Sequence, residues 1–242
     1  MSEIIKTEAI VLSKTDFSDS SKIVNLFTKE YGRMSAIIKG GRNKNSKIGM
    51  IVDPLNVINL VIYRKPNREL QLISSADLID HHRMLREDFE RLKFGFAVIE
   101  LINEYSMQEE TNKILFVGCK RILELLNSSN EHPLNMFLRF FLFFLKEIGY
   151  DINLEKCPSC NGEHRGKSEY GFLRSKGIIC SNCMKIEGGV ELSLELFELY
   201  RCLKLKKSVE FNESLSNKLL NHLLGFLEYH SIGFRGIKSL KL

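Results

Sequence analysis

The sequence lacks a hydrophobic run long enough to cross a membrane. Its most apolar window, residues 137–145, is interrupted by Arg139 and falls well short of the roughly 20 residues that a membrane helix needs. The opening residues, MSEIIKTEAIVLSK, lack the charged start and the apolar core of a signal peptide. We therefore expect a cytoplasmic protein with no membrane partner, whose cysteines are thiols or metal ligands and not disulfides.

Signatures of several enzyme classes are also missing. The glycines of IIKGGRNKNSK do not have the GxxxxGK spacing of a nucleotide-binding loop. Asp80, His81 and His82 resemble a metal-binding triplet of phosphoesterases, but no Asp-x-Asp or second acid-rich cluster completes a two-metal site. No Ser, His and Asp set stands out. These absences favour a protein that is not an enzyme, with a metal-dependent phosphoesterase as a weaker alternative.

The composition is that of a folded and mildly basic protein. With 242 residues, of which 44% are hydrophobic, the chain can form one large domain or two smaller ones. It contains no repeat, low-complexity tract or long linker. The net charge of +5 permits an anionic partner without proving one. Lysine and arginine concentrate in residues 32–47, 64–68 and 201–207.

Hydrophobic periodicity predicts an α+β fold. In residues 4–80 the apolar residues mostly alternate, which indicates five strands separated by turns rich in Gly, Asn, Pro and Ser. This spacing is typical of a five-stranded barrel of the oligonucleotide-binding (OB) type, although an SH3-like barrel would give a similar pattern. After Asp80 the apolar spacing becomes three and four, which predicts helices over 85–105, 111–126, 133–150, 192–205 and 214–230. We predict an OB domain over residues 1–80 and a helical domain over residues 81–242.

Four cysteines have the spacing of metal ligands. They form two C-x2-C pairs, Cys157 with Cys160 and Cys180 with Cys183. Two such pairs can supply a tetrahedral site, and YGFLRSKGIIC between them reads as a hairpin. We predict one structural Zn²⁺ in a ribbon inserted at about residues 155–190. Four thiolates leave no open position for a substrate, and the alternatives are two redox pairs or unrelated thiols.

Residues 32–47, GRMSAIIKGGRNKNSK, combine many cations with no acid. Such a stretch indicates contact with a polyanion, whereas its simplest alternative is a solvated hairpin. The candidate DNA-binding cations, including a second group that begins at residue 64, are Arg33, Lys39, Arg42, Lys44, Lys47, Arg64, Lys65 and Arg68. Phe17 and Tyr31 lie near this stretch and could stack on bases or belong to the barrel core.

Arg139 lies among the phenylalanines of the most apolar helix. A buried lone cation must find an anion or extend to solvent. The alternative is an apolar groove, formed by Arg139, Phe140 and Phe143, that receives a partner's carboxylate.

Three segments together resemble the RecO family of bacterial recombination mediators: residues 7–47, DLIDHHRMLREDFERL and RFFLFFLKEIGYDINLEKCPSCNG. The resemblance implies a non-catalytic protein of the nucleoid that binds single- and double-stranded DNA and anneals complementary strands. It also implies that the protein binds the acidic tail of the single-stranded DNA-binding protein (SSB), for which the Arg139 groove is a candidate. With RecR, such proteins help to load RecA, which is therefore an indirect partner.

Two departures from the family pattern affect these expectations. Asp19 stands where the family usually has glutamate, and Gly41 and Asn43 replace a small residue and a cation, which predicts weaker DNA binding by the loop. Some family members lack the cysteines, which implies that zinc holds the domain together. A zinc-ribbon protein that acts in transcription or binds RNA is the alternative function.

Overall fold

The computed structural model describes residues 3–66, 68–164 and 169–241. The outermost residues of both predicted domains, and residues 165–168 of the predicted zinc module, lie outside these ranges. The chain forms two compact units: residues 1–129 with 237–242, and residues 130–236. No helix in the described part of the chain combines the length and the apolar character that a membrane crossing requires.

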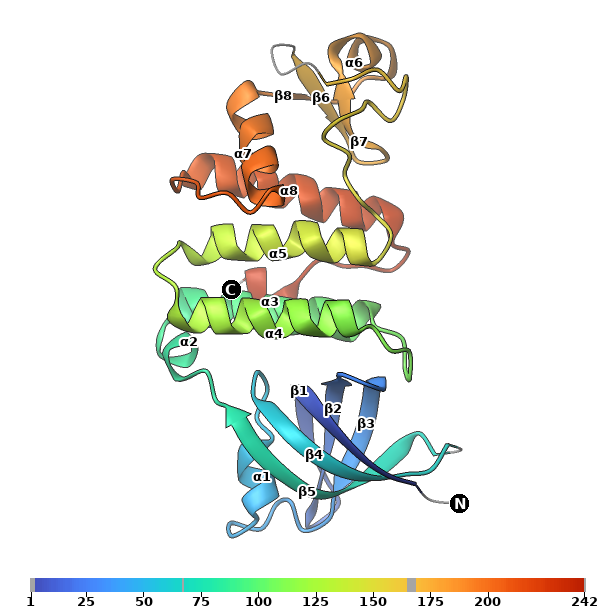
Figure 1. Cartoon of the computed structure of the whole chain (residues 1–242), viewed down its shortest axis with the longest axis vertical. Coiled ribbons are helices and arrows are strands. Elements are labelled where there is room, and N and C mark those ends of the chain that lie inside the picture. Colours follow the sequence, from blue (N-terminus) through green and yellow to red (C-terminus); the bar gives the residue numbers. More distant parts are fainter. Residues whose placement is uncertain (1–2, 67, 165–168, 242) are drawn as a thin grey trace. The chain divides into compact units, whose positions relative to one another are not determined.

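The first unit begins with a closed five-stranded barrel (Figure 1). Its strands are β1 (Glu3–Phe17), β2 (Ser21–Thr28), β3 (Gly32–Ile38), β4 (Val57–Arg64) and β5 (Leu70–Asp80). The order around the barrel is β1-β2-β3-β5-β4, with β3 and β5 parallel and the other pairs antiparallel. Inward side chains such as Val24, Ala36 and Ile58 are fully buried, as the alternating pattern predicts. The predicted OB-type barrel is confirmed.

Three helices and a terminal turn pack with the barrel in the same unit: α2 (Arg83–Glu87), α3 (Phe89–Tyr105), α4 (Lys113–Ser128) and η1 (Lys238–Lys241). Phe116 of α4 lies against Phe27 of β2, with ring centroids 5.8 Å apart, and Lys120 pairs with Glu8 of β1 at 2.6 Å. Glu100 of α3 accepts hydrogen bonds from the backbone of η1. The helices therefore cover one end of the barrel.

The second unit contains α5 (Pro133–Glu147), α7 (Leu194–Lys204) and α8 (Glu213–His230), with a small ribbon between α5 and α7. The ribbon consists of β6 (Tyr170–Leu173), β7 (Gly177–Cys180), α6 (Ser181–Glu187) and β8 (Val190–Leu192). Pro133 occupies the first turn of α5, where proline is tolerated, and Gly149 follows that helix with a φ of 90°, so proline and glycine mark the two ends of α5.

The predicted domain boundary at residue 80 coincides with the change from strands to helices. That it separates two domains stays a prediction. The compact units divide the chain after Ser129 instead. The reason is that the segment between α3 and α4 crosses the barrel end: Glu109 donates its backbone N–H to Arg33 O at 3.0 Å, and Thr111 Oγ1 donates to Glu30 O at 2.7 Å.

Candidate nucleic-acid interface and metal centre

The outer side of β3 carries two of the predicted cations. Met34, Ala36 and Ile38 point into the barrel core and are buried. The alternate positions of β3 and of the turn after it face outward and are half-buried or exposed: Arg33, Ser35, Ile37 and Lys39. Because strand side chains alternate between the two faces, one row presents two cations to solvent with a polar and an apolar residue between them.

Neighbouring strands extend this row into a mixed surface, which we call the outer face. Across it, Asn25 Nδ2 donates to Ser13 Oγ at 2.8 Å, and Ser35 Oγ donates to Asn25 Oδ1 at 2.7 Å. The next cross-strand row is Thr15, Ile23, Ile37 and Leu72, whose side chains are exposed or half-buried. This face includes strands β2 and β3, the part of an OB barrel that usually receives oligonucleotides.

The turn between β4 and β5 places two further cations at one end of the outer face. Lys65 and Arg68 are exposed there, and the turn lies beside β3 because Leu70 pairs with Ser35. Buried Gln71 fixes the turn, since its side chain accepts from the backbone N–H of Lys65 and donates to the carbonyls of Lys65 and Arg68. A cavity of about 170 Å³ is lined by both Arg33 and Arg68.

At the other end of β3, the loop of residues 39–46 carries exposed cations. It leads into the short helix α1 (Lys47–Ile51), whose first turn is capped by Ser46. Lys39, Lys44 and Lys47 are exposed and form no ion pair among the described residues. Arg42 is exposed as well, although its guanidinium donates to Ser18 O and lies 3.5 Å from Asp16.

The paired glycines of this loop have different roles. Gly41 is buried, and a Cβ atom added there would lie 3.0 Å from Ile38, while one added at Gly49 would lie 2.1 Å from Gly41 O. Gly41 therefore packs inside the loop against Ile38. Gly40 has a φ of 67° and forms the turn itself.

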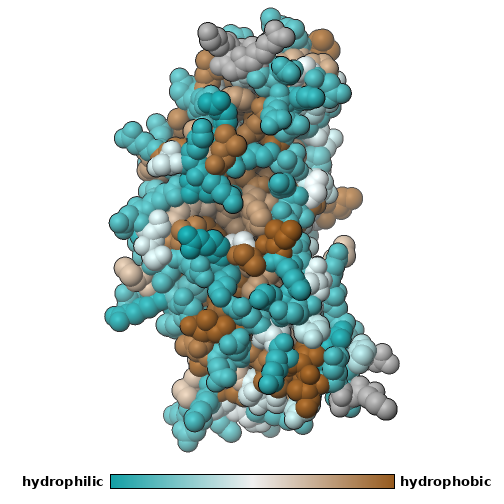
Figure 2. All heavy atoms as spheres, in the orientation of Figure 1, coloured by the Kyte–Doolittle hydropathy of each residue, from teal (hydrophilic) through white to brown (hydrophobic). Residues whose placement is uncertain are grey.

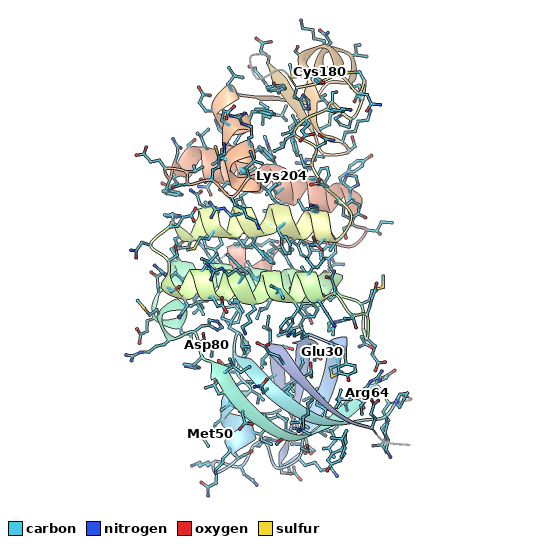
Figure 3. The ribbon with its side chains drawn as sticks, viewed as in Figure 1. Glu30, Met50, Arg64, Asp80, Cys180 and Lys204 are labelled. Carbon is cyan, nitrogen blue, oxygen red and sulfur yellow. The ribbon has the colours of Figure 1, made fainter. Side chains whose placement is uncertain are left out.

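Arg64 has two carboxylate partners and an aromatic neighbour within its own chain. Its guanidinium lies 5.5 Å from the centre of the Tyr31 ring, 2.8 Å from Glu109 and 3.7 Å from Glu3. Figure 3 shows Arg64 and Met50 of α1 on opposite sides of the barrel. The predicted cations thus form two groups. Of the two aromatic residues that could stack on bases, Tyr31 is already covered by Arg64, whereas Phe17 remains 47% exposed.

The side of the barrel formed by the β1–β4 pair is less suited to binding a polyanion than the outer face is. Figure 2 shows hydrophobic residues gathered over the β1–β4 pair. Ile4 and Tyr63 face each other in the register of these strands and are 61% and 43% exposed. The cations that line the outer face and its adjoining loops are the better candidates for contact with phosphates.

Asp80, His81 and His82 lie at the strand-to-helix junction and hold it together. His82 is fully buried, and its Nδ1 lies 2.9 Å from Leu55 O; its backbone N–H donates to Asp80 Oδ1 at 2.7 Å. His81 Nδ1 lies 3.1 Å from Asn56 Oδ1. Within the described residues, the only group of metal-binding side chains is the four-cysteine cluster, so nothing in this part of the chain supports a two-metal phosphoesterase site.

The protein should lose stability as the pH falls below about 6.5. Burial lowers the pKa of His82 below its ordinary value of 6.5, so the unfolded chain takes up a proton that the folded chain resists. This contribution is present above pH 6.5 and is lost as the pH falls, by at most about 1.4 kcal/mol per pH unit. In urea unfolding at about pH 7.5 and 5.5, the variant His82→Asn should show a weaker pH dependence. An unchanged dependence would contradict this account.

The four cysteines come together as their spacing predicts. Cys157 and Cys160 lie in a turn closed by hydrogen bonds from Cys157 N to Gly162 O and from Asn161 N to Cys157 O, both 2.8 Å. Cys180 ends β7, and Cys183 lies in α6. The four sulfur atoms lie within 4.8 Å of one another, and those of Cys160 and Cys180 are 3.7 Å apart. A tetrahedron with 2.3 Å Zn–S bonds has edges of about 3.8 Å, so the set fits one metal ion.

The surroundings of the cluster favour the thiolate of Cys157 but not that of Cys183. Burial acts to raise the pKa of the Cys157 thiol, but backbone N–H groups of Cys180, Cys160 and Ser159 outweigh it and lower that pKa to about 6. The pKa of Cys183 is raised by burial and by the neighbouring cysteines. A bound cation would remove this conflict by holding all four sulfurs as thiolates. By contrast, Cys119 is fully buried in α4 and Cys202 is half-buried in α7, far in sequence from any pair.

Arg139 already has a carboxylate partner. Its two terminal nitrogens lie 2.8 and 2.9 Å from the carboxylate of Glu131, and Nη2 also donates to Lys207 O at 3.1 Å. It lines a cavity of about 740 Å³ together with His132, Lys206 and Phe211. The rings of His132 and Phe211 are stacked, with centroids 3.4 Å apart.

Only one of the three predicted partner-binding residues lines this cavity. Phe140 is 4% exposed and packs with Phe143 and Phe144, and neither Phe140 nor Phe143 lines this cavity, so a groove formed by these phenylalanines and Arg139 stays a prediction. The sequence did not connect Glu131, Lys206 and Phe211 with Arg139, although the cation-rich stretch 201–207 was a signal. Long-range packing of α5 against the segment before α8 brings them together.

Comparison with known proteins agrees with the geometry. The family model described as Recombination protein O N terminal matches residues 1–82, and Recombination protein O C terminal matches residues 86–241. The DNA repair protein RecO of Chlorobium limicola is 36% identical over 189 residues, which are 78% of this chain and 70% of that protein. The DNA repair protein RecO of Clostridium novyi is 30% identical over 227 residues, or 93% and 87%. The match to the Chlorobaculum parvum protein, also 36% identical, spans 69% of this chain and only 64% of that relative.

Proposed function

Because the chain belongs to the RecO family of recombination proteins, we propose that it is a non-catalytic mediator of recombinational DNA repair. It would bind single- and double-stranded DNA, anneal complementary strands and, with RecR, help to load RecA onto SSB-coated DNA. Such work would place it at the nucleoid. A Zn²⁺ held by Cys157, Cys160, Cys180 and Cys183 would stabilise the ribbon without taking part in the function, since four thiolates leave no open coordination position.

The observation that carries this proposal is the pair of cationic ends that border the outer face. Arg33, Lys65 and Arg68 lie at one end, and Lys39 with the loop cations lies at the other. A strand laid along this face would exchange its condensed counterions for these side chains and could do so with any base sequence. Sequence-independent, salt-sensitive binding is what a protein that must attach to and leave arbitrary strands requires.

The test of this function is strand annealing on DNA coated with SSB, using SSB with and without its acidic tail. Annealing that depends on both this protein and the tail is expected. The same preparation should bind labelled single-stranded DNA in competition with duplex DNA and RNA. Preference for RNA would favour the transcription or RNA-binding alternative, and no uptake of DNA in dilute salt would remove the proposal.

The cavity at Arg139 is our candidate for the SSB tail. The tail ends in acids, an apolar residue and a free carboxylate, while the cavity offers Arg139, Lys206 and the Phe211 ring. Glu131 occupies the guanidinium of Arg139 with the geometry that an incoming carboxylate would need. The partner's carboxylate would therefore have to displace Glu131.

Replacing Glu131 should tighten tail binding, whereas replacing Arg139 should weaken it. Glu131→Gln removes the competing charge, so the affinity for a peptide of several aspartates followed by phenylalanine should rise about fivefold. Arg139→Lys keeps the charge but loses the two-pronged contact, and affinity should fall by about tenfold or more. Fluorescence anisotropy of the labelled peptide gives both values.

The C-terminal amide of the same peptide and the remote variant Lys146→Gln are the controls. The amide should bind weakly to every variant, and Lys146→Gln should bind like the parent protein. Equal affinities of the Glu131 and Arg139 variants would place the tail elsewhere on the protein.

A further inference from the structure

A second cavity in residues 130–236 has the opposite chemistry to the one at Arg139. It has a volume of about 430 Å³ and lies between α7 and the segment that leads into α8. Its apolar lining consists of Leu194, Leu199, Cys202, Val209 and Leu215. The other lining residues are Glu195, Glu198, Glu210 and Asn212. We call this the α7 groove.

The α7 groove has suitable dimensions to receive a short helix or strand. Leu194, Glu198 and Cys202 follow one another at intervals of four along α7, and Glu195 and Leu199 form the neighbouring row. At 1.5 Å per residue, the wall from Leu194 to Cys202 is about 12 Å long, or roughly two helical turns. The segment before α8 forms the opposite wall. The groove is open to solvent, because Leu194 is 45% exposed and the side chains of Val209 and Leu215 are only half-buried.

The rim of the groove is negative. Three glutamates line it, and the lining includes no lysine or arginine. Arg201 neutralises only Glu198, at 2.7 Å, and Glu210 forms no ion pair among the described residues. A nucleic acid or an acidic tail would be repelled here, although both suit the cationic sites described above.

We propose that the α7 groove is a docking site for a partner protein's amphipathic segment, whose aliphatic side chains enter the groove while flanking lysines or arginines meet the glutamates. An apolar floor inside a charged rim is the usual arrangement by which a groove takes a helix. This proposal goes beyond DNA binding and stands whether or not the barrel holds DNA. The groove is also distinct from the Arg139 cavity, since the two share only Val209 among their lining residues.

Cys202 provides a direct readout of occupancy. Its thiol is half-buried in the groove, whereas Cys119 is fully buried and the remaining four cysteines belong to the metal cluster. The probe is an amidated peptide of roughly 15 residues with leucine on one helical face and lysine elsewhere. Bound peptide should slow iodoacetamide alkylation of Cys202 in proportion to the fraction of protein bound, as measured by mass spectrometry of the fragment that contains Cys202.

Variants on the rim and floor decide the proposal. Leu194→Asp and the double variant Glu195→Lys, Glu210→Lys should each weaken peptide binding by about tenfold or more in anisotropy measurements. Ile186→Asp, at an exposed apolar residue of α6, is the matched control for Leu194→Asp, and Glu228→Lys, at an exposed acid of α8, is the control for a charge reversal outside the groove; both should bind normally. The thermal midpoint of each variant shows that it is folded, and the surface charge reversals keep the test valid should Leu194→Asp be unstable.

Three results would overturn the proposal. One is equal binding by the groove variants and the controls. Another is equal binding of a peptide in which every lysine is replaced by glutamate, since the rim would then have no influence. The third is a concentration-dependent dimer, seen by sedimentation, that Leu194→Asp dissociates, because a second copy of this chain would then be the occupant.

Discussion

Reversing Lys39, Arg42 and Lys44 to glutamate is expected to weaken binding of a single-stranded oligonucleotide by on the order of 100-fold in dilute salt. All three side chains are exposed on the loop that follows β3, and the two lysines have no ion-pair partner among the described residues. With each phosphate contact that is lost, fewer condensed counterions are released from the strand on binding. The slope of log affinity against log salt should therefore become less negative by about 2, at roughly 0.7 per contact on single strands.

The effect should be uniform across base sequences, because contacts to phosphates carry no sequence information. The matched control reverses three exposed lysines on helices, Lys113, Lys146 and Lys218, which changes the net charge equally. That control separates the loop from a general effect of charge. Equal losses in the two triple variants would show that the whole protein's field, and not the loop, attracts DNA.

Some parts of this candidate interface follow from local sequence and others do not. The alternation of RMSAIIK predicted β3 correctly, because the period of two is a local property of a half-buried strand. That Arg68 lies beside Arg33 depends on the parallel pairing of β3 with β5, which joins residues far apart in the chain. Periodicity cannot specify such a pairing, so the sequence grouped the cations only by their position in the chain and did not predict that Arg33 lies with the group of residues 64–68.

Arg64 and Arg139 illustrate the same limit for charge. The sequence offered Arg64 as an available cation, and for Arg139 it left open whether the side chain finds an anion, extends to solvent or receives a partner's carboxylate. In the structure each has found carboxylates of its own chain, Glu109 and Glu131. An ion pair between residues on different elements depends on packing, and so the residues that stay available to a ligand are known only after the fold is known.

The cysteine ribbon is the part of the molecule that local sequence predicts best, because its ligand spacing is local and its hairpin was predicted directly.

Chelation of the bound metal ion is the second change from which we expect a large effect. Besides the cysteines, the hydrophobic cluster at the four-cysteine site consists of Ile179 with the partly buried Leu173 and Met184. So small a core rarely folds unaided, whereas structural zinc sites contribute about 10–16 kcal/mol in isolated fingers.

Removing zinc with a chelator, or replacing Cys160 with serine, should abolish amide protection in β6 and β7, as measured by hydrogen exchange with mass spectrometry. Metal content should fall from one zinc per chain to none after chelation. Cys202→Ser is the matched control, since its thiol lies outside the cluster. The closed barrel has its own core, so protection of β2 and β4 should persist in the same samples. Unchanged protection of β6 and β7 after complete loss of zinc would mean that packing against α7 and α8, such as Tyr170 on Phe197 at 4.2 Å and Phe172 on His222 at 4.4 Å, suffices to hold the ribbon.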